Sequence, residues 1–257
     1  MEDRVLLEEM TWPEVKAALA DGTETVIIQT ASVEQHGPHL PLLTDTLIGG
    51  HVAQMIARKL GKTLVAPVVR PGLSVHHMKF PGSFTTAPET FRTVIEEACM
   101  SLATHGFKNL ILLSSHGGNF TFIDGIGPYL QDSMTRKGYK VRIIPHVNIL
   151  RYSRIQQNFV GEKFGVPLEE AGFHADVIET ACMLVIRPDL VRMDKMAPGF
   201  IGDNKPLLDK IFVEGIQSVT ENGIVGDPRR ATLEMGEALL EHLTGVLSGE
   251  LRERLGW

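Results

Sequence analysis

The chain has 257 residues, of which 43% are hydrophobic and 22% charged, a composition typical of globular proteins that excludes a disordered or collagen-like chain. Its formal net charge of −6 argues against nucleic acid or an anionic membrane as a partner. The sequence has no run of about eighteen apolar residues and no signal-peptide pattern at its N-terminus, so we expect a cytoplasmic protein without a membrane span.

Apolar periodicity and turn residues predict strands that alternate with helices. In chain order, the predicted elements are a helix over 12–19, a strand over 25–30, a helix over 46–60, a strand over 63–69, a helix over 88–105, a strand over 109–114, a helix from about 119, a strand over 140–145, an irregular or partly helical stretch to 167, a short helix over 176–185 and a last helix over 232–247. This alternation is typical of βαβ units, so we expect one α/β domain over residues 1–257, with a mostly parallel sheet covered on both faces. Ligands bind beyond the carboxyl ends of the strands in such sheets, and polar loops follow the predicted strands at Thr30, Val69 and Ser114.

The sharpest polar segment is EQHGPHLPLLTD, residues 34–45, which leaves the first predicted strand. Glu34 and His36 are two residues apart, so an extended backbone projects them to the same side. Pro38 and Pro41 stiffen the loop before Asp45, which lowers the entropy lost when a site assembles. Imidazole and carboxylate ligands suit Zn, Mn or Fe(II). We therefore expect a metal site; the alternative is a solvated loop in which Asp45 caps the next helix.

A second polar segment, SSHGGN over 114–119, follows the clearest buried strand. His116 is expected at the carboxyl end of a central strand, facing the same crevice as the first segment. Gly117 and Gly118 allow close backbone approach, and the N-terminus of the following helix favours an anion or oxyanion. We expect Gly117, Gly118 and Asn119 to bind substrate; the alternative is a strand-to-helix turn with Asn119 as the N-cap.

The third segment, FHADVIET over 173–180, places His174 and Glu179 around the start of a predicted helix. Glu179 is a candidate metal-ligating carboxylate, but its spacing from Asp176 also fits a capping box. His174 is our candidate for proton transfer, because the charge of an imidazole changes near neutral pH.

The long loop over 70–88 contains the segment SVHHMK, in which we predict that Ser74 and His77 contact the substrate. His76 and Lys79 lie on the same loop and are weaker candidates. The alternative for such a loop is a surface crossing or a contact between subunits.

Together, the segments EQHGPHLPLLTD, SHGGN and HADVIET resemble the creatininase family, which comprises creatinine amidohydrolases and their relatives. FPGS and the late GDPRRAT are also similar, so the resemblance runs from about residue 12 to 247. It implies a three-layer α/β/α sandwich, a divalent-metal hydrolase with one or two Zn, Mn or Fe(II) ions, and often a ring-like homohexamer. The residues that match the family's metal ligands are Glu34, His36, Asp45 and His116, with Asp45 placed to bridge two ions. Glu179 matches a family glutamate and is our choice for the remaining carboxylate, and His174 matches the histidine that would transfer a proton.

Two departures from the family pattern concern the metal and the substrate. Creatininase itself has an acidic metal ligand two residues past the histidine that matches His116, where this chain has Gly118. The resemblance therefore implies that a second metal ion would have a different set of ligands here. Creatininase closes tryptophans over its flat substrate, but Trp12 and Trp257 are the only tryptophans here and neither is in a matching position. Creatinine is therefore not the expected substrate. Other branches of the family deformylate a formamidopyrimidine, cleave a peptide or hydrolyse an oxidised cyclitol, and the motifs do not separate these.

The sequence thus predicts a hydrolase in which metal-activated water attacks the carbonyl of a small substrate, a cyclic amide or a formamide. Among enzymes, the alternatives are hydrolysis of an oxidised cyclitol or another non-amide carbonyl compound, and isomerisation of a sugar. A metal-dependent binding or sensor protein without turnover is the alternative from another class, and it predicts a metal with protein ligands at every position.

Overall fold

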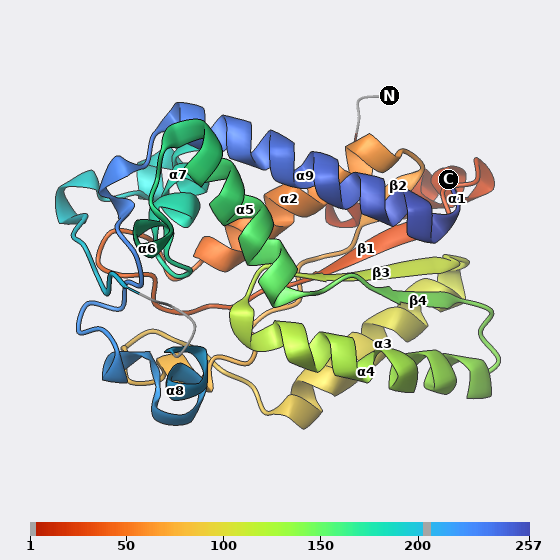
Figure 1. Cartoon of the computed structure of the whole chain (residues 1–257). Helices are drawn as coiled ribbons and strands as arrows, with labels where there is room; N and C mark the ends of the chain where they lie inside the picture. The colour runs from red at the N-terminus through yellow and green to blue at the C-terminus, as the bar shows by residue number, and fades with distance from the viewer. Residues whose placement is uncertain (1–3, 203–206) are drawn as a thin grey trace.

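The computed structural model describes residues 4–202 and 207–257 of the chain (Figure 1). Its strands are β1 (Thr25–Thr30), β2 (Thr63–Val65), β3 (Asn109–Ser114) and β4 (Arg142–Pro145). They form a parallel sheet in the order β2-β1-β3-β4. β1 and β3 pair over their full length, from Thr25 opposite Asn109 to Thr30 opposite Ser114. The two central strands therefore end side by side, and the loops that leave them start at the same edge of the sheet.

Helices cover both faces of this sheet. The α-helices are α1 (Trp12–Ala20), α2 (Thr44–Leu60), α3 (Pro88–His105), α4 (Gly117–Arg136), α5 (Ile149–Phe164), α6 (Leu168–Ala171), α7 (Val177–Ile186), α8 (Leu207–Glu214) and α9 (Leu233–Leu255). In Figure 1, α2, α5, α7 and α9 lie on one side of the sheet, and α3 and α4 lie on the other. The predicted α/β/α class with a parallel sheet is confirmed.

Two apolar cores separate the layers, because successive strand residues point to opposite faces. Ile27 and Ile111 pack with the layer of α2, α7 and α9, whereas Val26 and Leu110 pack with α3 and α4. Apolar side chains on both faces are typical of parallel strands buried between two helical layers. The strand interiors are thus used for packing, and the polar groups gather in the loops at the carboxyl edge.

Two boundaries near that edge differ from the prediction. α2 begins at Thr44 instead of residue 46, so Asp45 lies inside its first turn and is not its N-cap. β2 ends at Val65, and Val69 forms only an isolated bridge with Thr30. Asp45 is consequently held by a regular helix, which fixes its side chain more firmly than a loop would.

Helices occupy most of the chain between β4 and residue 167. The stretch that we predicted to be irregular or partly helical contains α5, whose N-cap Asn148 accepts the backbone N–H of Arg151 at 2.9 Å. Gly165 ends α5 with the left-handed backbone that favours glycine, at φ 64°. α9 continues past its predicted end because Leu251 and Leu255 still pack in the core. None of the described helices combines the length and the apolar character needed to cross a membrane.

Candidate metal centre

Acidic and imidazole side chains from different elements meet at the carboxyl edge of the sheet. Glu34 lies on the loop after β1, Asp45 in the first turn of α2, and His116 directly after β3. Their exposed fractions are 1%, 3% and 2%, respectively. His116 Nδ1 lies 3.1 Å from Glu34 Oε1 and 3.2 Å from Asp45 Oδ2. The adjacent ends of β1 and β3 explain why residues so far apart in sequence come together.

The hydrogen bonds of His116 determine which of its nitrogens is free. Its Nε2 lies 3.1 Å from the carbonyl oxygen of Leu73, which can only accept, so Nε2 carries a proton and donates it. In the neutral ring, Nδ1 then presents a lone pair to two carboxylate oxygens. Glu34 Oε2 is also buried, and it has no hydrogen-bond partner among the described residues. Acceptors that face one another in this way need a cation or an added proton between them.

A second set of donors shares Asp45 with the first. His36 Nδ1 donates to the backbone carbonyl of Glu34 at 3.1 Å, which leaves Nε2 as the free nitrogen. His36 Nε2 lies 3.3 Å from Asp45 Oδ1 and 3.7 Å from Glu179 Oε2. The two oxygens of Asp45 therefore face different sets. We call the two sets together the donor centre: Glu34, Asp45 and His116 form the first, and His36, Asp45 and Glu179 form the second.

The electrostatics of the donor centre fit a divalent cation. Burial opposes a charge on His116, yet the carboxylates of Glu34 and Asp45 raise the pKa of its imidazole to about 10. Burial likewise opposes a charge on His36, whose pKa is raised well above its usual value by Glu179 and Asp45. Without a cation, the carboxylates are thus compensated by protons on two imidazoles. A divalent metal ion would take the place of those protons, and the residues present fit such an ion.

Glu179 contacts both the turn before α7 and the second donor set, and its role as a metal ligand stays a prediction. Its Oε2 accepts the backbone N–H of Ala175 at 2.5 Å, while Asp176 caps α7 by accepting the N–H groups of Ile178 and Glu179. Ala175 has a left-handed backbone at φ 51°, which is costly for a residue with a side chain, and the bond to Glu179 helps to hold it. The same Oε2 faces His36. One carboxylate therefore braces the turn before α7 and completes the second donor set.

His174 precedes α7 and lies beside the donor centre, and its role in proton transfer stays a prediction. Its ring centroid is 4.4 Å from that of His36. Its Nε2 donates to the backbone carbonyl of Gln35 at 2.8 Å, so Nδ1 carries the free lone pair of the neutral ring. Burial, and after it the positive charge of His36, lower the pKa of His174. The neutral form of His174 is therefore the resting form near neutral pH.

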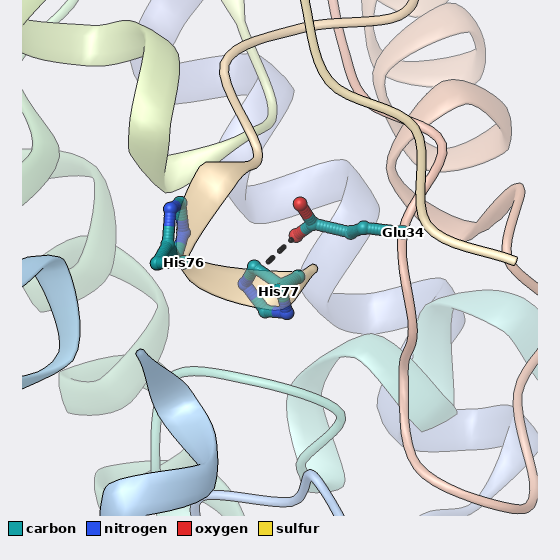
Figure 2. Close-up of side chains that lie close together, drawn as sticks. All are labelled: Glu34, His76 and His77. Atoms are coloured by element: carbon teal, nitrogen blue, oxygen red, sulfur yellow. Dashed lines mark ion pairs between the residues drawn. The ribbon is translucent and has the colours of Figure 1, made fainter. Parts of the chain in front are cut away.

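The loop before α3 brings further side chains to the donor centre through a short 3-10 turn, η2 (Val75–His77). His77 Nε2 lies 3.4 Å from Glu34 Oε1, as Figure 2 shows. Ser74 Oγ lies 3.3 Å from His116 Nε2. Both predicted residues are thus buried against members of the donor centre, and their contact with a substrate stays a prediction.

Sequence reasoning gave too little weight to three residues around this centre. The ring of His76 is parallel to that of His116 at 5.6 Å between centroids, and it contacts Phe212 of α8 edge-on at 4.9 Å. Gln35 reaches both His77 and His174 with its side-chain amide. The position of Gln35 inside the first motif is a signal that could have identified it. Phe212 had no such signal, because we predicted no helix in its region.

The glycine pair opens α4. Gly117 and Gly118 are its first two residues, and the N–H groups at that position have no acceptor inside the helix. The N-cap is the preceding histidine, so the alternative of Asn119 as the cap is wrong. The side chain of Asn119 accepts the N–H of Leu73 at 3.0 Å and donates to the carbonyl of Ala31 at 3.2 Å. Asn119 is fully buried, and both ends of its amide hold backbone groups of the fold, so its contact with a substrate stays a prediction.

Gly118→Ala is expected to weaken zinc binding about 10- to 100-fold, because it disturbs a group that orients a metal ligand. The new Cβ would lie 2.6 Å from His116 Nε2 and even closer to the carbonyl oxygen of Leu73 that this nitrogen contacts. Competition with a chromophoric chelator measures the affinity. Gly125→Ala on the same helix is the matched control, since its Cβ would meet no atom within 4 Å. Equal zinc affinity of Gly118→Ala and the unmodified protein would contradict this account.

Imidazoles and carboxylates buried at the carboxyl edge of a parallel sheet are typical of α/β enzymes that use divalent metals. The sequence model of the creatininase family, described as creatinine amidohydrolase, matches residues 8–250 of the chain. The chain therefore belongs to the creatininase family, and it is a hydrolase.

Relatives with different named activities match over most of their length. Creatinine amidohydrolase of Pseudomonas putida is 26% identical over 265 residues, covering 98% of both chains. Mycofactocin precursor peptide peptidase of Mycolicibacterium smegmatis is 30% identical over 232 residues, covering 88% of this chain and 84% of the relative. The 3-dehydro-scyllo-inosose hydrolase of Thermotoga maritima is 28% identical over 262 residues, covering 93% and 81%. Membership of the family consequently leaves the substrate open.

Solved structures of creatininase match the fold over nearly the whole chain. A zinc form of a creatininase variant has a TM-score of 0.78 at 25% identity, covering 98% of both chains. A manganese form has a TM-score of 0.77 at 25% identity, with the same coverage. Both matches agree with the predicted creatininase-like sandwich.

Proposed function

We propose that the chain is a divalent-metal-dependent hydrolase in which water attacks the carbonyl of a small cyclic amide or formamide. The observation that carries this proposal is the convergence of acceptors in the donor centre, where His116 Nδ1 faces Glu34 and Asp45 at 3.1 and 3.2 Å. The zinc and manganese forms of neighbouring creatininase structures support the same conclusion.

One cation would be held by the first donor set and a second by the other, so the centre fits one or two ions. Zn, Mn and Fe(II) suit ligands of this kind. A divalent cation supplies Lewis acidity, which lowers the pKa of water towards about 7 and polarises a substrate carbonyl. Asp45 would serve both positions through its two oxygens. The second position would depend on Glu179, because Gly118 offers no side chain there.

The chain's own residues would move the proton and bind the oxyanion. In the resting form, His174 offers the lone pair of Nδ1, since its Nε2 proton is engaged by the backbone of Gln35. His174 would accept a proton from the attacking water and pass it to the leaving nitrogen as the C–N bond breaks. The N–H groups of Gly117 and Gly118 would stabilise the negative oxygen, an effect of about 3 kcal/mol per donor. A formamide gives formic acid and an amine, and a cyclic amide opens to one product that carries both the carboxylic acid and the amine.

Creatinine is disfavoured as the substrate, because neither tryptophan of the chain lies in the donor centre. Trp12 opens α1 and is 77% exposed, and Trp257 follows α9 and is 52% exposed. An oxidised cyclitol is the second candidate, favoured by the relative named as a hydrolase of such a compound. We include a homo-oligomer in the proposal, as an expectation from the family resemblance.

The test uses full-length protein stripped with a chelator and reloaded with Zn, Mn or Fe(II). Each form is assayed with cyclic amides, formamides, short peptides, oxidised cyclitols and simple sugars, and both the released acid and any conversion of the sugars are quantified. We expect acid release from an amide or a formamide, restored by metal. Conversion of a sugar without acid release would replace hydrolysis by isomerisation, and metal binding without any turnover would favour the sensor alternative.

A further inference from the structure

The side-chain amide of Gln35 has a fixed orientation beside the donor centre. Gln35 is 5% exposed, and its Oε1 accepts the backbone N–H of Gly37 at 2.9 Å. Its Nε2 donates to the carbonyl of Gly223 at 3.1 Å. Exchanging the amide oxygen and nitrogen would set donor against donor at Gly37 and acceptor against acceptor at Gly223. The amide nitrogen is therefore the atom that faces the histidines.

The second N–H of this amide has two imidazoles within reach. Gln35 Nε2 lies 3.0 Å from His77 Nδ1 and 2.9 Å from His174 Nε2. His174 Nε2 already carries a proton, which it donates to the backbone carbonyl of Gln35 at 2.8 Å, so it cannot accept another. The remaining N–H of Gln35 is consequently donated to His77 Nδ1.

This donation decides the tautomer of His77. An imidazole that accepts at Nδ1 is neutral and carries its proton on Nε2. Figure 2 shows His77 turned towards Glu34, with Nε2 3.4 Å from Oε1. The Nε2 proton of His77 therefore lies at ion-pair distance from Oε1, while the other oxygen of the carboxylate, Oε2, has no hydrogen-bond partner among the described residues. With the opposite tautomer, a nitrogen lone pair would face the carboxylate and repel it.

We propose that Gln35 is a positioning residue of the donor centre: it holds His77 in the tautomer whose Nε2 proton lies beside Glu34 and so steadies, by electrostatic attraction, the carboxylate that would bind the metal. This inference deepens the proposed function and rests on the metal-binding part of it. In this arrangement His77 supports a ligand and is not itself a ligand, because its Nε2 lone pair is occupied by the proton. Supporting partners of this kind typically change metal affinity about 10- to 100-fold when they are removed.

The first test is the ¹⁵N spectrum of the histidines in the full-length, metal-free protein. Long-range ¹⁵N–¹H correlations distinguish a protonated from an unprotonated ring nitrogen, and the signals that vanish in His77→Gln identify His77. We expect Nε2 protonated and Nδ1 unprotonated in the unmodified protein. A proton on Nδ1 would overturn the proposal without the need for any further variant.

The second test is Gln35→Met, which keeps the length of the side chain and removes the hydrogen bonds of its amide to Gly37, Gly223 and His77. We expect the His77 tautomer to change and Zn²⁺ affinity, measured against a chromophoric chelator, to fall about 10- to 100-fold. The matched control is Gln131→Met, because Gln131 also spans two backbone groups, with Val141 at 3.0 Å and Ile143 at 2.9 Å, far from the donor centre. Lower zinc affinity with an unchanged His77 tautomer would show a merely structural role and overturn the proposal, as would unchanged zinc affinity.

A double variant separates positioning from packing. His77→Gln replaces the imidazole by an amide, whose N–H can face Glu34 whatever the state of residue 35, so we expect near-normal zinc affinity. In the His77→Gln background, adding Gln35→Met should lower the zinc affinity little further. An equal loss of zinc affinity on Gln35→Met in both backgrounds would contradict the positioning of His77 by Gln35. These measurements need no substrate, so a protein that binds zinc but hydrolyses nothing would refute the proposed hydrolysis and leave this inference standing.

Discussion

Asp45→Ala is expected to remove bound metal and to lower turnover by about 1,000-fold or more. The reason is that Asp45 is the only member common to both donor sets, with Oδ2 3.2 Å from His116 Nδ1 and Oδ1 3.3 Å from His36 Nε2. A Lewis acid contributes several kcal/mol to stabilisation of the transition state. Because about 1.4 kcal/mol corresponds to a factor of ten in rate, its loss should cost three powers of ten or more.

The measurement is metal content by elemental analysis beside kcat on whichever amide or formamide proves to be a substrate. Asp132→Ala is the matched control, because Asp132 lies on the solvent side of α4 and pairs with Arg136, one turn away. The control should keep both metal and turnover. Full metal content in Asp45→Ala would refute the assignment of Asp45 as a metal ligand. If turnover were lost all the same, Asp45 would act in the chemistry alone.

The layers and the donor positions were accessible from the sequence because each has a strong local signal. β1 and β3 are short apolar runs, and donors placed just after parallel strands must meet at a common edge. Glu34 and His116 could therefore be paired without a structure. α5 was predicted only as an irregular or partly helical stretch, because Gln156 and Val160 are its only buried residues, which leaves a weak apolar stripe to detect.

The finer geometry of the centre depends on contacts that a single sequence does not encode locally. The free nitrogen of His116 is set by a carbonyl on the loop before α3, and the proton on His77 is set by Gln35. The lack of room for a side chain at Gly118 likewise arises from the approach of that loop. Such contacts join segments far apart along the chain, so motif spacing could place the ligands but not orient them.

His174→Gln is expected to keep the metal and to lower kcat by about 100- to 10,000-fold, the usual contribution of a positioned proton-transfer group. Glutamine preserves an N–H for the backbone carbonyl of Gln35, which His174 Nε2 contacts at 2.8 Å, but it has no nitrogen that can accept a proton. The variant therefore removes the proton transfer while it leaves the support of the loop in place.

Metal content and kcat of His174→Gln, measured together, separate this role from that of a ligand. His174 lies close enough to Glu34 and His36 to share an ion with them, so a joint loss of metal and turnover would make His174 a ligand. If the variant kept both its metal and normal turnover, His174 would have no role in the reaction. His242→Gln is the control, because His242 stacks on Phe159 at 4.3 Å on the outer helical layer and should affect neither readout. If His174→Gln loses turnover but keeps its metal, the result fits the proposed role, in which Nδ1 of His174 accepts a proton and passes it to the leaving nitrogen.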